Sequence, residues 1–330
     1  MHHRLLLIFM LVLGLQGACA TPEFQATPVT LTDQVSVGQV YQGIRLLGAL
    51  RLNDVQSNGL PLCGLSGLAW DEDAGLLYAI SDQGALFHLR PEFDASGMLS
   101  GVQWVAAYPL RDELDQPLRS PSSDAEGLAI RNGDNGKPDD AELLISFEDK
   151  PRVVRYSPTG LWKGEERLPA PLRDLRNYRN PNQALEAVTI DPRWGVLTGT
   201  EAPLRNDPDG QIRLFRLDGR FWRYPLSSAP NSALVAIEAL PDGGLLTLER
   251  AFVAPLRPLI ISLRRVMLPA DTAKPLPVRD VAVFDSSQGW LLDNFEGLTR
   301  YRGQRFFMVS DDNCKFWQAT LLVEFELLPD

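Results

Sequence analysis

The sequence predicts an all-β protein that folds as a single β-propeller, and two observations carry this prediction. One motif recurs five times at blade-sized intervals, and short strand-like runs fill the spaces between its copies. The sequence contains no amphipathic pattern of twelve or more residues that would predict a long helix. The 26 glycines and 25 prolines fit many short strands separated by turns.

The recurring motif has the same order of parts in each copy. A short apolar run with a small or acidic residue near its start is followed by a turn, and then by a second apolar run that ends in a charged pair. The anchor residues of the five copies are Ser66, Glu126, Glu186, Glu238 and Glu296, at intervals of 60, 60, 52 and 58 residues. Intervals of roughly 40–60 residues with several short strands each predict propeller blades rather than helical repeats.

The segments between the motifs supply the remaining strands. Pairs of strand-like runs follow the second, third and fourth copies, at 152–168, 211–226 and 258–284. Each unit therefore holds about four antiparallel strands, the usual content of a blade. The last unit offers only three strands, and the run Gly43–Asn53 at the other end of the chain has no blade of its own. We expect this N-terminal strand to close the ring.

The number of blades has two readings. Five anchors favour five blades. Residues 21–42 offer an alternative, in which they form part of a degenerate sixth blade; otherwise they are an N-terminal extension before a propeller domain at 43–330.

The first twenty residues, MHHRLLLIFMLVLGLQGACA, read as a signal peptide. Arg4 precedes eleven apolar residues, and Ala18-Cys19-Ala20 has the small-x-small pattern of a cleavage site. We expect an exported protein, periplasmic or extracellular. Lipidation at Cys19 is the less favoured alternative, because Gln16 stands where a lipobox has an aliphatic residue. No segment is long and apolar enough to predict a transmembrane helix.

Removal of the signal peptide leaves two cysteines, Cys63 and Cys314. Cys63 precedes the first anchor strand, and Cys314 follows the second strand of the last unit, so ring closure makes their blades neighbours. Exported chains fold where disulfides persist. We therefore predict a disulfide between them.

Seven motifs together resemble the phytase-like family, whose members are labelled "esterase-like activity of phytase". They are SGLAWD (66–71), DAEGLAI (124–130), LISFED (144–149), LEAVTI (185–190), LLTLER (245–250), NFEGLTRY (294–301) and VSDDN (309–313). The resemblance covers about residues 45–326. It implies a secreted or periplasmic propeller with hydrolytic activity on esters.

Several functional classes are disfavoured by composition. The chain has 32 basic and 42 acidic residues, a net charge of −10, and nucleic-acid binders normally present a basic surface. His88 is the one histidine left after signal cleavage, and its strand-like surroundings indicate a structural role. There is no G-x-S-x-G motif, and too few histidines and cysteines for a zinc site.

The positive signal is acidic and periodic. Glu126, Glu186 and Glu296 occupy the same place in three units. A second set of carboxylates closes the second run of each unit: Asp82, Glu148, Glu201, Glu249 and Asp311. Because equivalent positions of successive blades form rings around one axis, we predict that these carboxylates meet at one mouth of the channel. Clustered oxygen ligands suit Ca²⁺ or Mg²⁺; the alternative is a set of carboxylates that cap turns.

Basic residues follow these carboxylates closely, notably Arg152 and Arg250. A metal beside arginine suits a phosphoester, because the metal activates water and arginine binds phosphate. The sequence thus predicts a metal-dependent ester or phosphoester hydrolase that acts as a monomer on a small molecule. Glu126, Glu186, Glu296, Arg250 and Arg152 are the candidate catalytic residues. The alternative is a non-catalytic binding propeller in which the carboxylates hold a structural cation and the basic residues form ion pairs.

Overall fold

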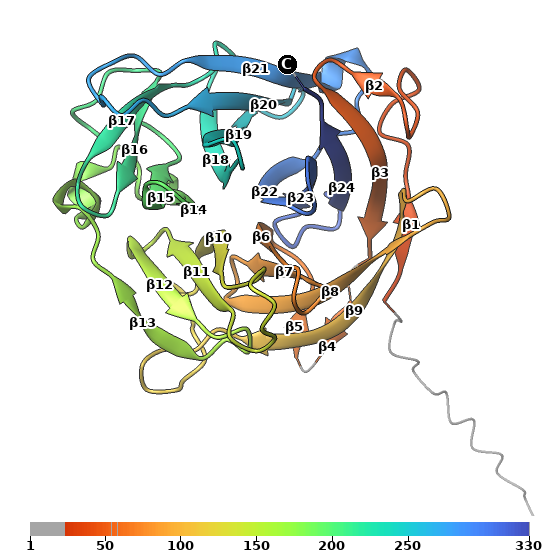
Figure 1. Cartoon of the computed structure of the whole chain (residues 1–330), viewed down its shortest axis with the longest axis horizontal. Coiled ribbons are helices and arrows are strands. Elements are labelled where there is room, and N and C mark those ends of the chain that lie inside the picture. The colour runs from red at the N-terminus through yellow and green to blue at the C-terminus, as the bar shows by residue number, and fades with distance from the viewer. Residues whose placement is uncertain (1–23, 54, 58, 330) are drawn as a thin grey trace, which may run out of the picture.

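Five antiparallel sheets surround a common axis in the computed structural model, which describes residues 24–53, 55–57 and 59–329 (Figure 1). Each sheet runs outward from a first strand near the centre of the disc. These are the blades of a five-bladed propeller, as the repeats predicted. The predicted signal peptide, and with it Cys19, lies outside the described residues.

The blades follow one another along the chain, and each is built from four strands. Blade 1 consists of β6 (Leu65–Asp71), β7 (Leu76–Ser81), β8 (Ala85–Phe93) and β9 (Leu99–Pro109). Blade 2 consists of β10 (Ala125–Arg131), β11 (Glu142–Phe147), β12 (Arg152–Tyr156) and β13 (Trp162–Glu166). Blade 3 consists of β14 (Leu185–Asp191), β15 (Gly195–Thr200), β16 (Gln211–Arg216) and β17 (Phe221–Pro225). Blade 4 consists of β18 (Ser232–Ala239), β19 (Gly244–Ala251), β20 (Ile260–Met267) and β21 (Val278–Asp285).

Blade 5 joins the two ends of the chain. It consists of β22 (Asn294–Arg300), β23 (Arg305–Asp311), β24 (Thr320–Leu327) and β3 (Ile44–Leu52), which pairs with β24 along its length. The predicted closure by an N-terminal strand is confirmed. Residues 24–43, the described part of the preceding segment, form no sixth blade, because β1 (Ala26–Pro28) and β2 (Val40–Tyr41) both pair with β3 at the outer edge of blade 5.

The predicted disulfide is present between Cys63 and Cys314, with their Cα atoms 5.0 Å apart. It links the segment that leads into blade 1 to the loop after β23 in blade 5, so it lies at the point of ring closure. Among the described residues no helix is long and apolar enough to cross a membrane. The helical elements are single 3₁₀ turns in connections, such as η4 (Ser286–Gln288).

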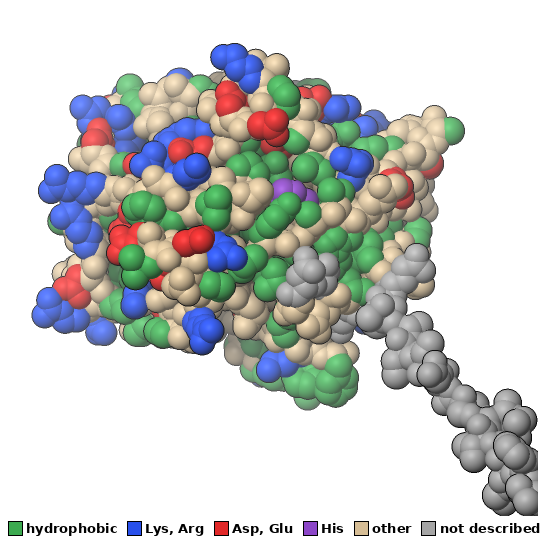
Figure 2. Space-filling view, turned by 90° about the horizontal axis from the view of Figure 1, so that it is seen from below, with side chains coloured by type: hydrophobic (Ala, Val, Ile, Leu, Met, Phe, Trp, Pro, Cys, Tyr) green, Lys and Arg blue, Asp and Glu red, His purple; other side chains and the backbone are tan. Residues whose placement is uncertain are grey.

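The core lies between the blades, and each of its five apolar clusters joins residues of neighbouring sheets. The first strands are buried on both faces, which explains why their sequences are nearly continuous apolar runs. Outer strands alternate, as in β17, where Trp222 and Tyr224 are buried and Arg223 is exposed. The edge of the disc accordingly shows acidic and basic side chains interspersed with apolar ones (Figure 2).

The first strands approach each other closely around the axis. A Cβ atom added to Gly67 would lie 2.6 Å from the carbonyl oxygen of Glu126 in the next blade. Beyond this point an apolar ring fills the centre, formed by Leu68, Leu128, Val188, Ile237 and Leu298. The cavity left there is about 10 Å³, at most enough for about one water. This waist separates the channel into two mouths.

Candidate functional site

One mouth of the channel, here called the acidic mouth, lies where the first strand of each blade begins and the second strand ends. Every first strand carries a register shift against its second strand just after its start. The residue at this bulge is Ser66, Glu126, Glu186, Val235 or Glu296 in blades 1 to 5. Bulges re-aim side chains and are common beside functional sites. Here they direct three glutamates toward a common point.

The three bulge glutamates lie close enough together to share a cation. Glu126, Glu186 and Glu296 each place a carboxylate oxygen within 4.8 Å of the other two. Oxygens on opposite sides of a Ca²⁺ ion lie about 4.6–5.2 Å apart, given Ca–O distances of about 2.3–2.6 Å. All three residues are at most 9% exposed. The predicted convergence of these side chains therefore matches the geometry, and their oxygen-only chemistry fits a hard divalent cation.

Two further groups extend the cluster outward. Glu148, Glu186 and Glu201 have carboxylate oxygens within 4.8 Å of one another, and so do Asp124, Glu126 and Glu148. Glu148 also accepts a hydrogen bond from the backbone N–H of Ala184 at 2.7 Å. The six carboxylates, here called the acidic cluster, thus come from blades 2, 3 and 5.

The second ring of predicted residues follows directly after the second strands. The strand pairing makes Asp82, Glu148, Glu201, Arg250 and Asp311 equivalent, because their preceding residues all pair with the residue before the bulge. In blade 4 the equivalent residue is therefore Arg250. The prediction had placed Glu249 in this ring, one residue too early, and had placed the anchor of blade 4 at Glu238 rather than at Val235.

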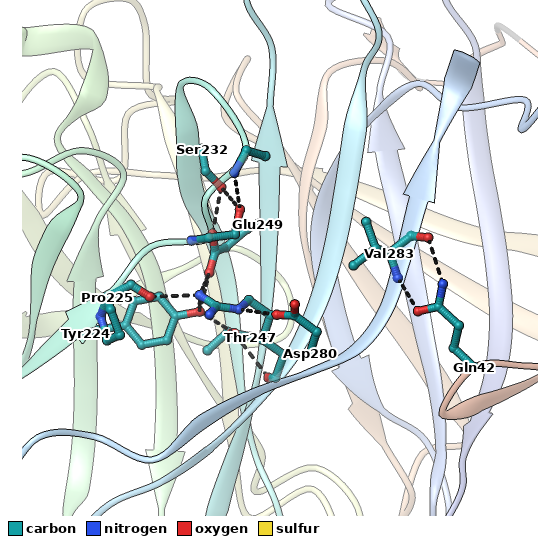
Figure 3. Close-up of polar contacts among 11 residues, drawn as sticks. Gln42, Tyr224, Pro225, Ser232, Thr247, Glu249, Asp280 and Val283 are labelled. Atoms are coloured by element: carbon teal, nitrogen blue, oxygen red, sulfur yellow. Dashed lines mark hydrogen bonds and ion pairs between the residues drawn. The ribbon is translucent and has the colours of Figure 1, made fainter. Parts of the chain in front are cut away.

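Glu249 does not belong to the acidic cluster and lies in a separate network of polar contacts (Figure 3). Its carboxylate forms an ion pair with Arg264 at 2.7 Å, accepts a hydrogen bond from Ser232 at 2.6 Å and is also bonded by the Tyr224 hydroxyl. Arg264 in turn contacts Asp280 at 2.8 Å. Because this fully buried carboxylate is already satisfied by protein donors, we assign it a structural role between blades 3 and 4.

Arg250 is the one basic side chain that contacts the acidic cluster among the described residues. Its guanidinium lies 2.8 Å from Glu201 and 3.2 Å from Glu296. It also donates a hydrogen bond to the side-chain oxygen of Asn294. The side chain is only 20% exposed, so water screens these pairs weakly. One cation against six carboxylates leaves a local excess of negative charge.

Burial and this excess of negative charge raise the pKa values of the clustered glutamates. Burial, followed by repulsion from neighbouring carboxylates, raises the pKa values of Glu126 and Glu186 well above the ordinary range. Burial also raises the pKa of Glu296 well above it, although Arg250 acts in the opposite direction. The pKa of Glu148 rises to about 8, chiefly through burial. A divalent cation would offset the same repulsion without protons.

The remaining predicted residues lie beside the cluster or outside it. Asp82 and Asp311 stand at the blade 5–blade 1 side, where burial, together with repulsion from Asp82 and Asp312, raises the pKa of Asp311 to about 7. Arg152 lies farther out, where it donates to the backbone oxygens of Ser122 and Lys150 and stacks over Phe147. His88 is buried between two tyrosine rings, Tyr78 and Tyr108.

The sequence analysis missed two polar residues of the site, Asp124 and Asn294. Both occupy the position two residues before a bulge glutamate, in Asp124-Ala125-Glu126 and Asn294-Phe295-Glu296. Asn294 donates a hydrogen bond to Glu296 at 2.8 Å and bonds Arg250, so it holds both partners in place. The repeated spacing of a polar residue and a glutamate was the available signal.

The comparison that decides the family is with a family model. The model of the phytase-like family, "Esterase-like activity of phytase", matches residues 60–314. The chain belongs to the phytase-like family. The matched region contains all five bulge positions and both cysteines of the disulfide.

Comparisons with curated proteins and with solved structures do not identify the function of this phytase-like protein. No curated protein matches the chain. Among solved structures it is similar to XC5397 from Xanthomonas campestris, a gluconolactonase, with a TM-score of 0.42, 12% identity, and coverage of 93% of this chain and 99% of that one. It is also similar to the Cps50 (Swd1) β-propeller domain of Myceliophteria thermophila, with a TM-score of 0.40, 10% identity, and coverage of 91% and 99%. Its function must be argued from the site.

A pocket of about 580 Å³ opens beside the acidic cluster of the phytase-like protein. Glu201 and Arg250 form its inner wall, and Arg179, Asn231 and Phe252 lie among its outer residues. Its size suits a small molecule. The pocket therefore places a ligand-sized space against Glu201 and Arg250, at the edge of the acidic cluster.

Proposed function

We propose that this phytase-like protein is an exported, divalent-metal-dependent ester or phosphoester hydrolase with its site at the acidic mouth. The observation that carries the proposal is the convergence of Glu126, Glu186 and Glu296 within 4.8 Å, beside Glu201 and Arg250, which line a pocket of about 580 Å³. Membership of a family described by esterase-like activity supports the reaction class. The disulfide and the signal-like first twenty residues support export.

The cation in this proposal is Ca²⁺ or Mg²⁺, held by the three bulge glutamates. Glu148 and Glu201 lie next to Glu186 and would complete the ligand set or orient a water. When bound, such a cation supplies Lewis-acid polarisation of an ester oxygen and a water of lowered pKa. No histidine or thiol in the described cluster competes for softer metals.

Arg250 would position the substrate in this proposal. It stands between the cluster and the pocket, and it contacts Glu201 and Glu296. A cation that binds Glu296 competes with Arg250 for that carboxylate. The guanidinium is then available to a substrate oxygen in the pocket, where arginine can bind a phosphate or carboxyl group through two hydrogen bonds.

The test is an assay of purified protein with nitrophenyl esters of phosphate and of acetate, in the presence of Ca²⁺, Mg²⁺ or EDTA. We expect hydrolysis that EDTA removes and one of the two cations restores. Glu186→Gln should lower kcat/KM by about 100-fold or more, because the glutamine keeps the shape of the side chain but removes the charged metal ligand. Glu165→Gln, on the exposed face of β13, is the matched control and should be silent.

Two results would contradict the proposal. One is hydrolysis that is indifferent to chelation, and the other is a Glu186→Gln variant that behaves like Glu165→Gln. The amide lacks the charge that its neighbours repel, so the metal-free variant should fold at least as well as the wild type. Loss of activity then cannot be ascribed to unfolding, and thermal unfolding checks this point.

A second candidate is a non-catalytic binding propeller with a structural cation at the same place. It is favoured by the deep burial of the glutamates and by the engagement of Arg250 with two of them. In that case Ca²⁺ raises the unfolding temperature, and no ester in the panel is hydrolysed. The assay and the thermal measurement together distinguish the two functions.

A further inference from the structure

Apolar side chains are exposed on one sector of the same face that carries the acidic mouth. They lie on three loops of blades 4 and 5, at 252–259, 286–293 and 312–319. The exposed residues, here called the apolar sector, are Phe252, Val253, Leu256, Leu291, Phe316 and Trp317. Phe316 is 86% exposed and Trp317 is 67% exposed, which is unusual for large aromatic residues.

The three loops form one continuous surface. The backbone N–H of Leu259 donates to the Ser286 hydroxyl at 2.9 Å, which joins the first loop to the second. Asp293 accepts hydrogen bonds from the Gln318 amide at 3.0 Å and from the Ala319 backbone at 2.7 Å, which joins the second loop to the third. The exposed residues therefore belong to adjacent loops rather than to scattered points of the disc.

The loop that carries the two aromatic residues is firmly held. The disulfide ties Cys314 to Cys63, and Asp312 accepts hydrogen bonds from the backbone of Gly64 and of Cys314, both at 2.9 Å. Phe316 and Trp317 stack edge to face with ring centroids 4.8 Å apart. A rigid loop that presents two aromatic rings to water gains no core packing from them. Exposed patches of this kind mark interaction surfaces.

The charges of the three loops select the partner. The two acidic residues, Asp293 and Asp312, turn inward and bind backbone amides. The two basic residues, Arg257 and Lys315, are exposed beside Leu256 and Phe316. The outward face of the sector is therefore apolar and positively charged, although the whole chain carries a net charge of −10.

We propose that the apolar sector docks the protein on the surface of an anionic phospholipid bilayer. Trp and Phe favour the interfacial region of a bilayer, and flanking Lys and Arg favour anionic headgroups. Docking in this way would turn the face of the acidic mouth toward the lipid. The proposal does not depend on hydrolysis, because it concerns binding alone.

The experiment is flotation of the full-length mature protein with vesicles of phosphatidylcholine, alone or mixed with phosphatidylglycerol, in EDTA so that no cation bridges the two. We expect binding to the mixed vesicles, and a blue shift of tryptophan emission that Trp317→Ser reduces. The double variant Phe316→Ser/Trp317→Ser should bind at least about tenfold more weakly. Leu114→Ser, which removes a 73% exposed leucine from another loop, is the control and should bind like the wild type.

A second variant separates charge from burial. Arg257→Gln/Lys315→Gln should weaken binding to the mixed vesicles several-fold and leave any binding to pure phosphatidylcholine unchanged. Absence of wild-type binding to both vesicles would overturn the proposal. So would self-association that the aromatic double variant abolishes, since it would identify the sector as a protein interface. Equal unfolding temperatures of all variants verify that the fold is intact.

Discussion

The two mouths of the channel lie at opposite ends of the same ten inner strands, yet their charges are arranged in different ways. The mouth opposite the acidic one opens into a pocket of about 510 Å³ whose charged lining is balanced, with Glu72, Asp134 and Glu238 against Arg131, Arg300 and Arg302. Some of these pair directly, as Arg302 does with Glu72 at 2.8 Å. The acidic mouth instead sets six carboxylates against Arg250.

This difference is the reason that we propose the acidic mouth, rather than the opposite one, as the ligand site. Paired charges at the opposite mouth satisfy themselves, whereas the acidic cluster is electrostatically unfavourable until something positive binds. The connections on the acidic side are also long, at 110–124, 167–184, 201–210 and 312–319. Long loops on a rigid scaffold are where function usually lies.

The disulfide should be the largest stabilising element of the acidic face. It closes a loop with a sequence separation of 251 residues. Loop-closure entropy gives about 5 kcal/mol as an upper value for Cys63→Ser/Cys314→Ser, measured by denaturant unfolding. Reduction of the wild type should give the same loss. An unfolding curve that is indifferent to reductant would show that the strand pairing of β3 with β24 closes the ring unaided.

Arg250→Gln should destabilise the metal-free protein strongly. It leaves the buried carboxylates of Glu201 and Glu296 without their partner, and breaking a buried pair costs about 3–5 kcal/mol. The control is Arg302→Gln at the opposite mouth, where the exposed pair with Glu72 is worth at most about 1 kcal/mol. Saturating Ca²⁺ should restore part of the first loss. Equal losses for the two variants would refute the contrast between the mouths.

The stability of the metal-free protein should fall as pH rises from about 4.5 to about 8. The folded cluster binds protons more tightly than the unfolded chain, because its pKa values are raised, to about 8 for Glu148. At pH values between the unfolded and the folded pKa of a group, the native state holds one more proton than the unfolded chain. The free energy of unfolding then falls by about 1.4 kcal/mol per pH unit for each such group. Ca²⁺ should flatten this slope, as thermal unfolding across pH would show.

At the opposite mouth, Glu238 should titrate above the usual range of a carboxyl group. Burial raises the pKa of Glu238 to about 7. Glu238→Gln should therefore remove only a small part of the pH dependence below about pH 7, whereas Glu126→Gln should remove more. If the two variants changed the slope equally, the acidic mouth would hold no special excess of charge.

A side chain added at Gly67, where the first strand of blade 1 approaches that of blade 2, should destabilise the fold. Gly67→Ala would place Cβ 2.6 Å from the Glu126 oxygen and 2.9 Å from the Leu128 nitrogen. Overpacking of this kind costs about 1–3 kcal/mol in unfolding free energy. The reverse change at the equivalent position of blade 3, Ala187→Gly, should cost about 1 kcal/mol or less. A neutral Gly67→Ala would mean that the inner strands can move apart.

The propeller, its closure, its disulfide and five of the six carboxylates of the acidic cluster could be predicted from the sequence alone. Repeat spacing is a property of chain length per blade, and ring closure turns equivalent positions into neighbours. Glu126, Glu186 and Glu296 could be found in this way because each occupies the same place in an otherwise similar motif. The cysteine pair followed from the same ring logic.

Which residue of blade 4 enters the ring depends on the register between its strands, and motif spacing alone does not reveal it. A strand alternates faces at every residue, so an error of one position exchanges the channel for the space between blades. The bulge in β18 falls at Val235, three residues before the predicted anchor Glu238, and β19 then directs Arg250 toward the acidic cluster and Glu249 toward Arg264. Motif similarity does not record a bulge, because it depends on hydrogen-bond register between strands. That register placed the single arginine among six carboxylates.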